Sequence, residues 1–362
     1  MGPYKYLDHY NKICNQLLLD HIEKADGSNL IMSPLSIISM LQIAADSVSG
    51  ETKEELIRYI NGYSDMKYDL NDFQKLMQYT GELKSANGVI IADKIKGKVR
   101  EDYITSVKEK HDAEVFSSED IVRDVNKWVS EKTKGMIDSI ADESMNQMLL
   151  SLINAISFMA DWEEQYEDSD IHTGKFNNQD GSISQVKMMS STEYSYIEND
   201  FFNGFTKDYK DENYCFMALL PKKKRSKTFL KRAIDGSKLS ELFLNAQDIK
   251  VHAAMPEFKA EFSENLNALL ERNGINRIFT NSADFSPVSE EVPLKMDSIL
   301  HKAYIEVDRR GTKAAAVTMG WVVAAGASAE ESKTVYLDRP FVYAIVNKLT
   351  GYPVFIGTVN NL

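Results

Sequence analysis

The segment 306–340 constrains the fold of this chain more than any other, because its middle shows neither strand nor helix pattern. Just before it, apolar and polar residues alternate from His301 to Asp308, which predicts a strand with one buried face. No strand pattern returns until Thr334. Connections of this length are uncommon in compact domains and are usually either functional or disordered. The composition argues against disorder, so we expect a functional loop.

If this loop is considered as a strand that is not yet part of a sheet, its two sides differ. One side carries only small, uncharged residues: Thr312, Ala314, Ala316, Thr318 and Gly320. The other side includes larger or charged residues: Lys313, Val317, Met319 and Trp321. Only the first side could enter a filled interior, because added bulk costs about 1–3 kcal/mol per site and a buried unpaired charge costs more. The pattern fits a segment that can insert into a sheet, and a mobile Ala/Gly-rich linker is the alternative.

The flanks of the loop carry a family resemblance. The sequences from His301 to Thr318 and from Asp338 to Ile345 resemble the two sides of the reactive-centre loop of the serpins, and Phe355 to Val359 resembles a closing strand of that family. Further residues match the family pattern near the start of the chain: Asn29, Ser33, Pro34, Ser36, Ile37, Gly50 and Thr52. The resemblance extends from about Tyr6 to Val359, which is effectively the whole chain.

The resemblance implies an α+β protein with the serpin fold. Such a fold has a large mixed central sheet, smaller sheets, surrounding helices and an exposed reactive-centre loop, here at about 309–333. It also implies a single domain over residues 1–362. The length of 362 residues alone would suggest two domains, but no Pro/Gly/Ser-rich linker divides the chain.

The run from Leu149 to Ala160 is almost continuously apolar, which predicts a central strand covered on both faces. Asn154 is its exception. A buried amide without a partner costs about 1–3 kcal/mol, so we expect Asn154 to be hydrogen-bonded. By resemblance, a polar cluster beneath the sheet, where strands part to admit the loop, contains Asn154 and His301 together with Ser33 and Ser36.

Two further residues, Trp162 and Thr173, resemble those at the top of the serpin sheet, where insertion begins. A satisfied core residue is the alternative interpretation for each of them taken alone. Serpins usually carry an acid at the position of Arg309 and a base at that of Glu257, and both charges are reversed here. The reversal predicts an ion pair between Arg309 and Glu257, which would contribute about 0–1 kcal/mol if it were mostly exposed.

The resemblance also places the hinge and the cleaved bond of the loop. The hinge consists of Arg309, Arg310, Gly311, Thr312, Lys313, Ala314, Ala315, Ala316, Val317 and Thr318. Counting from Gly311 with the family's spacing puts the cleaved bond at Ala325–Gly326. The loop is slightly longer than in the commonest inhibitors, so Ala327–Ser328 and Glu330–Glu331 remain as alternatives. The residues around these bonds are mostly small and aliphatic, which favours elastase-like or subtilisin-like proteases over trypsin-like ones.

The function implied by the resemblance is that of a suicide-substrate inhibitor, not of an enzyme. A serine protease cleaves the loop and forms a covalent acyl complex, and the freed arm enters the sheet as a new strand, releasing stored strain. A non-inhibitory carrier or chaperone with the same fold is one alternative. A hydrolase is another, but the sequence from Gly326 to Glu330 lacks the final Gly of a nucleophile elbow.

Composition narrows the partners. A net charge of −12 disfavours nucleic acids and anionic membranes, and no apolar run is long enough to span a membrane. Cys14 and Cys215 lie in apolar strings, which predicts buried free thiols. We expect a monomer with neither cofactor nor metal. The start of the chain has no apolar leader, which fits a cytoplasmic protein or a secreted one whose leader has been removed.

Overall fold

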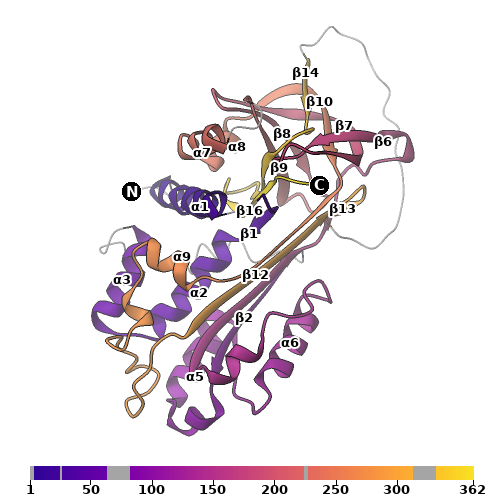
Figure 1. Cartoon of the computed structure of the whole chain (residues 1–362). Helices are drawn as coiled ribbons and strands as arrows, with labels where there is room; N and C mark the ends of the chain where they lie inside the picture. Colours follow the sequence, from indigo (N-terminus) through magenta and orange to yellow (C-terminus); the bar gives the residue numbers. More distant parts are fainter. Residues whose placement is uncertain (1–3, 25–26, 63–81, 224–226, 313–331) are drawn as a thin grey trace. The chain divides into compact units, whose positions relative to one another are not determined.

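The computed structural model describes residues 4–24, 27–62, 82–223, 227–312 and 332–362 (Figure 1). Contacts cluster into two compact units. Unit 1 contains Met1–Met32, Phe158–Ala260 and Ile305–Leu362, and unit 2 contains Ser33–Ser157 and Glu261–Tyr304. Five segments in sequence thus alternate between the units, so the chain crosses from one to the other four times. The expectation of a single domain stays a prediction.

Unit 2 is built on a sheet whose strands run in the order β3-β2-β4-β12, and β11 pairs with β12. These strands are β2 (Leu83–Ile91), β3 (Ala113–Phe116), β4 (Leu150–Phe158), β11 (Phe258–Asn265) and β12 (Ser298–Val307). All nine residues of β4 are buried, which confirms the predicted central strand. Strands β4, β11 and β12 each have their last or first residues in unit 1.

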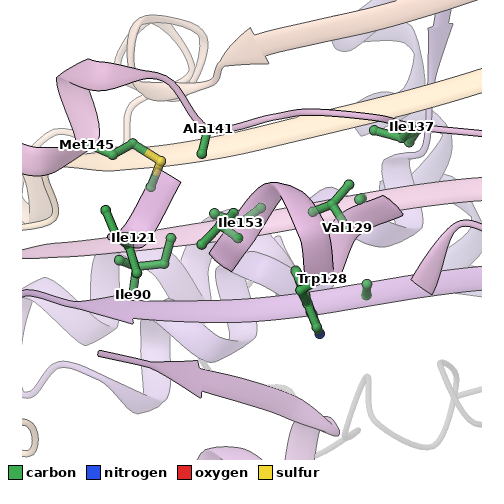
Figure 2. Packing of buried hydrophobic residues seen from close by; sticks show 11 residues of the cluster. Ile90, Ile121, Trp128, Val129, Ile137, Ala141, Met145 and Ile153 are labelled. Carbon is green, nitrogen blue, oxygen red and sulfur yellow. The ribbon is translucent and has the colours of Figure 1, made fainter. Parts of the chain in front are cut away.

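Five α-helices lie in the described part of unit 2. They are α2 (Pro34–Asp46), α3 (Gly50–Asn61), α5 (Glu101–His111), α6 (Ile121–Lys132) and α9 (Asn267–Arg272), with short 3-10 turns η1 (Asp93–Lys98), η2 (Glu143–Gln147) and η4 (Arg277–Phe279). Helix α6 has an apolar stripe that packs on β2 and β4, where Trp128 and Val129 share a cluster with Ile90 and Ile153 (Figure 2). An amphipathic helix on a sheet is the packing that such a stripe predicts.

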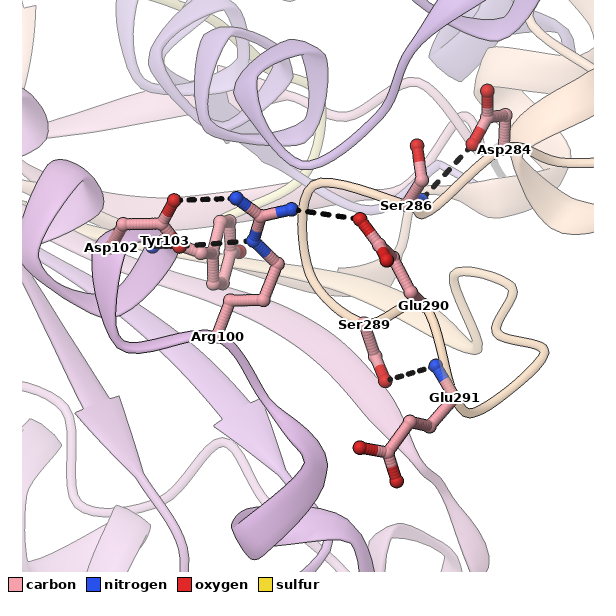
Figure 3. A network of polar contacts seen from close by, with 8 residues as sticks. All are labelled: Arg100, Asp102, Tyr103, Asp284, Ser286, Ser289, Glu290 and Glu291. Carbon is pink, nitrogen blue, oxygen red and sulfur yellow. Dashed lines mark hydrogen bonds and ion pairs between the residues drawn. The ribbon is translucent and has the colours of Figure 1, made fainter.

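Polar contacts fasten the start of α5 to the segment 284–291 (Figure 3). The Arg100 guanidinium lies 2.7 Å from an Asp102 carboxylate oxygen and 3.1 Å from one of Glu290. All three side chains are well exposed. Exposed ion pairs contribute little to stability, so this network orients the segment more than it stabilises the unit.

Unit 1 contains a nine-stranded sheet in the order β1-β16-β15-β9-β8-β7-β10-β14, with β6 paired to β7. Its strands are β1 (Leu30–Met32), β6 (Ile171–Asn177), β7 (Ile183–Glu198), β8 (Phe202–Asp208), β9 (Tyr214–Pro221), β10 (Gln247–Pro256), β14 (Ser332–Tyr336), β15 (Phe341–Asn347) and β16 (Pro353–Val359). Among the described residues, neighbouring strands of this sheet pair antiparallel, except that β10 and β14 pair parallel. The sheet is therefore mixed.

The described part of unit 1 also contains three helices and three short elements. They are α1 (Tyr4–Lys24), α7 (Lys227–Asp235), α8 (Leu239–Leu244), η3 (Asp168–Asp170), β5 (Ala160–Asp161) and β13 (Gly311–Thr312). Cys14 and Cys215 are both free and buried, as predicted. Helices and mixed sheets together confirm the α+β class. None of the helices in the described ranges is long and apolar enough to cross a bilayer.

Candidate functional site

The hinge of the predicted loop is partly built into a sheet. After β12 the chain turns back, and Thr312 of β13 pairs antiparallel with Val307 on one side and with Ala160 of β5 on the other. The Asp308 side chain closes the turn, because its Oδ1 accepts hydrogen bonds from the backbone N–H of Arg310 at 2.7 Å and from that of the next residue at 3.2 Å. The first residues of the hinge are thus already strand residues.

Gly311 and Thr312 suit this close approach. A Cβ added at Gly311 would lie 2.1 Å from the backbone oxygen of Ala160, so no larger residue fits without moving the strand. Thr312 is fully buried, and its Oγ1 is hydrogen-bonded to the Tyr209 hydroxyl at 2.8 Å. Gly311 therefore meets the steric demand of the close approach, and the Thr312 hydroxyl supplies a partner for the buried Tyr209 hydroxyl.

Two buried aromatic residues, Trp162 and Tyr166, hydrogen-bond the backbone of the turn at 308–310. The backbone N–H of Trp162 donates to the carbonyl of Arg310 at 2.8 Å, and its indole Nε1 donates to the carbonyl of Asp308 at 2.9 Å. Its ring stacks on Tyr209 with centroids 4.5 Å apart. The backbone N–H of Tyr166 donates to the carbonyl of Arg309 at 3.0 Å. The structure thus brings Trp162 to the hinge, and it adds Tyr166 and Tyr209.

Thr173 is not joined to this group. It lies exposed on β6, opposite Lys187 of β7. Within the described residues no hydrogen bond links it to Trp162 or to the hinge. Its expected role at the top of the sheet stays a prediction.

The predicted ion pair between Arg309 and Glu257 is wrong. Both residues are described, and each has another partner: Arg309 pairs with Asp168, and Glu257 lies 3.3 Å from the Lys187 ammonium. The Arg309 guanidinium also donates to the Tyr166 carbonyl at 3.2 and 3.3 Å. Asp168 raises the pKa of Arg309, and Glu257 makes only the smallest of the contributions to this shift. The acidic segment after Trp162 supplies the nearer carboxylate.

In unit 2, β4 and β12 are hydrogen-bonded directly to each other. Their parallel register joins seven residue pairs, from Ser298 opposite Ser151 to Tyr304 opposite Ser157. We call this pairing the seam. His301 lies opposite Asn154 near its middle, so the two polar residues that the resemblance grouped together do lie together.

A chain of hydrogen bonds, which we call the relay, crosses the seam from Ser33 to Asn87. The Ser33 backbone N–H donates to His301 Nε2 at 3.4 Å, and His301 Nδ1 lies 3.0 Å from Asn154 Oδ1. The Asn154 amide donates in turn to Asn87 Oδ1 at 2.9 Å and to Ser85 Oγ at 3.2 Å. Asn154 therefore has the partners that its burial requires. Because Nε2 accepts and Nδ1 donates, the imidazole is neutral, and complete burial lowers the pKa of His301 to about 3.

The four residues predicted for the cluster have different places in it. Ser33 contributes its backbone, while its Oγ caps α2 by accepting from the Ser36 N–H at 3.2 Å. Ser36 therefore contacts the relay through Ser33. Asn87 and Ser85 were not predicted. The available signal was Asn87 itself, a polar residue within the buried run from Ala86 to Ala92.

Much of the predicted loop lies outside the described residues. This holds for the hinge residues from Lys313 to Thr318 and for all three candidate bonds, Ala325–Gly326, Ala327–Ser328 and Glu330–Glu331. These assignments stay predictions. In the described parts of the chain, no group of three or more His, Cys, Asp or Glu side chains is placed to hold a metal ion.

Comparison with known proteins defines the class. The family model for serpins, serine protease inhibitors, matches residues 8–362. Serine proteinase inhibitor 1 of rabbitpox virus (strain Utrecht) is 30% identical over 362 residues, covering 95% of this chain and 98% of the relative. An uncharacterized serpin-like protein of Thermococcus kodakarensis is 28% identical over 350 residues, covering 93% of this chain and 81% of the relative.

Solved structures agree with the sequence comparison. The thermophilic serpin tengpin in its native state has a TM-score of 0.87 and 32% identity, and the match covers 100% of this chain and 95% of that one. Tengpin in its latent state has a TM-score of 0.80 and 30% identity, with 100% and 99% covered. The fold and the site therefore define a serpin. This chain belongs to the serpin family, whose members generally inhibit serine proteases.

Proposed function

We propose that this protein is a suicide-substrate inhibitor of elastase-like or subtilisin-like serine endopeptidases. The protease cleaves Ala325–Gly326, or one of the two alternative bonds nearby, and forms an acyl-enzyme. The freed arm from Thr312 then enters the seam as a new strand and carries the protease with it. Small aliphatic residues at 322–327 support this choice of target, because a pocket that selects by size favours them.

The register of β13 is the observation that carries the proposal. Thr312 pairs antiparallel with Val307, so extending the strand puts Ala314, Ala316 and Thr318 opposite Ile305, Ala303 and His301. Directly opposite residues of an antiparallel pair share one face of the sheet. Those three β12 residues are fully buried. The small side of the loop would thus face the interior, and the side with Lys313 would face away from it.

The second edge of the inserted strand gives the same alignment. Thr312 also pairs with Ala160, and an unchanged antiparallel register along β5 and β4 puts Thr318 opposite Asn154. His301 and Asn154 are already opposite each other across the seam. Insertion would therefore separate this pair and bring the Thr318 hydroxyl between them. A hydroxyl both donates and accepts, so it can replace the bond that insertion breaks.

Insertion also supplies the free energy that trapping needs. About ten new backbone hydrogen bonds, at about 0.5–1.5 kcal/mol net each, give on the order of 10 kcal/mol. This is comparable to the whole stability of an ordinary domain. An acyl-enzyme held by such a change would be released very slowly.

Incubation with pancreatic elastase and with subtilisin tests the function. We expect a covalent complex on a denaturing gel with at least one of them, and no complex with trypsin. Mass spectrometry of the released C-terminal peptide identifies the cleaved bond. Cleavage by both proteases without complex, and without a rise in melting temperature of the cleaved protein, would instead establish a non-inhibitory serpin.

A further inference from the structure

One ion pair of unit 1 is buried on both sides. The ammonium of Lys207 on β8 lies 3.0 Å from Oε1 of Glu193 on β7, and the two side chains are only 4% and 12% exposed. For comparison, the Lys222–Glu198 pair of the same unit is 36% and 42% exposed. Burial raises the pKa of Glu193, while Lys207 opposes that shift. Two charges in such a place are costly unless each compensates the other.

Aromatic rings cover this pair. The Lys207 ammonium lies 4.7 Å from the ring centroid of Tyr166 and 5.7 Å from that of Trp162. Ser191 Oγ donates to Glu193 Oε1 at 2.6 Å and lies 3.4 Å from the Tyr166 hydroxyl. The buried ammonium thus has one carboxylate and two aromatic faces as partners, which is a favourable cation–π environment.

These two rings belong to the residues that hold the hinge. Trp162 binds the carbonyls of Asp308 and Arg310, and Tyr166 binds the carbonyl of Arg309. We propose that Lys207 and Glu193 form a positioning element for the hinge, whose mutual neutralisation keeps Trp162 and Tyr166 closed on the turn before β13. The consequence for inhibition rests on the proposed function, whereas the positioning itself does not.

The Lys207–Glu193 pair would act on Trp162 and Tyr166 through charge more than through packing. Lys207 and Tyr166 line an open pocket of about 540 Å³, together with Glu164, Asp170 and His252. If only one charge of the pair remained, it would be stabilised by water, and water reaches it when Tyr166 moves off the pair. Removing one charge therefore favours a loosened hinge. Removing both charges eliminates this tendency, because a Met beneath the rings still packs well against them.

Amide hydrogen exchange measured by mass spectrometry tests the proposal on the full chain. The variants are Lys207→Met, Glu193→Gln and the double variant, and the readout is exchange in peptides covering 158–170 and 305–312. We expect each single variant to accelerate exchange at the Trp162 and Tyr166 amides by at least about tenfold, and the double variant to stay within about threefold of wild type. The control, Lys222→Met, removes one charge of the exposed pair and is expected to change nothing.

Several outcomes would overturn the proposal. Independent, additive effects of the two substitutions would mean packing without charge coupling, and so would single variants that match wild type. Equal acceleration in β9 and β15 would show a loss of global stability. If Lys207→Met does not fold, Glu193→Gln and the double variant still give the answer, because the proposal requires the second substitution to restore slow exchange.

An inhibition assay separates this inference from the proposed function. With a protease that the wild type traps, we expect Glu193→Gln to shift the products towards cleaved, uncomplexed protein, and the double variant to reverse that shift. A wild type that traps no protease would refute the proposed function and leave the exchange experiment intact. If the wild type traps proteases but the single variants exchange no faster than it does, the positioning role alone would be refuted.

Discussion

The hinge and the seam are held by different kinds of interaction. At the hinge, aromatic residues bind the backbone of a turn, and charged side chains surround them: Asp168, Glu193, Lys207 and Arg309. At the seam, a ladder of seven backbone pairs is crossed by one relay of neutral groups centred on His301 and Asn154. At the hinge, Gly311 and Thr312 are already paired with β5, whereas at the seam β4 and β12 are paired directly with each other. In the proposed mechanism, loop entry would therefore be prepared at the hinge and opposed at the seam.

A charge at the first inward position is expected to have the largest effect. Thr312 is fully buried between β12 and β5, so Thr312→Arg would place a guanidinium in a filled, buried position. We expect the ratio of trapped to cleaved protein to fall at least about a hundredfold with an elastase that the wild type traps. Denaturing gels measure this ratio. The matched control is Lys313→Arg, at a position that the proposed register directs away from the interior, and an equal loss in the control would contradict that register.

Breaking the hydrogen bonds across the seam is expected to have the second-largest effect. Asn154→Ala leaves the buried Nδ1–H of His301 and the amide oxygen of Asn87 without this partner. At about 1–3 kcal/mol for each such group, we expect the free energy of unfolding to fall by about 3 kcal/mol, measured by urea denaturation. Asn146→Ala, which removes an exposed amide of the same unit, is the control and is expected to change it by less than about 0.5 kcal/mol. A similar small change in both variants would mean that the relay does not hold the seam.

Acid is expected to weaken the seam through His301. The pKa of this imidazole is about 3 in the folded protein and 6.5 ordinarily, so unfolding takes up a proton at any pH between these values. The neutral-imidazole contribution is complete above pH 6.5 and is lost as the pH falls towards 3, at about 1.4 kcal/mol per pH unit. At pH 5 the loss is about 2 kcal/mol.

Urea denaturation of wild type and His301→Gln between pH 7 and pH 4 measures this contribution as a difference of slopes. Asp46 responds in a separate range, because a hydrogen bond from His111 lowers its pKa from 3.8 to about 2, so its contribution is lost only below about pH 4. Parallel slopes for the two proteins above pH 4 would assign the acid sensitivity to other groups.

The sequence predicts the seam better than the hinge, for a physical reason. The strand β4 is buried on both faces, so its apolar run identifies it, and Asn154 is recognisable as the residue that needs a partner. The partner of Arg309 could not be predicted, because long exposed side chains reach any nearby carboxylate and the path of the segment around Asp168 follows no periodic pattern. Lys207 gives no sign of burial either. Lysine is normally exposed, and the Glu193 carboxylate together with the rings of Tyr166 and Trp162 explains the burial of Lys207.

Removing an exposed charge at the hinge is expected to have the smallest effect, because the aromatic residues would still hold the hinge. Asp168 is almost fully exposed in its pair with Arg309, so Asp168→Ala is expected to cost at most about 1 kcal/mol and to leave the yield of trapped protease within about twofold of wild type. Tyr166 would still bind the hinge through its backbone N–H, which that substitution does not touch. Raising the salt concentration to 1 M screens exposed pairs in the same way and should reproduce the variant's behaviour in the wild type. A large loss of trapping in Asp168→Ala would mean that the exposed Arg309–Asp168 ion pair, and not the buried aromatic residues, holds the hinge. The hinge and the seam would then differ only in that the interactions holding the hinge are exposed and those holding the seam are buried.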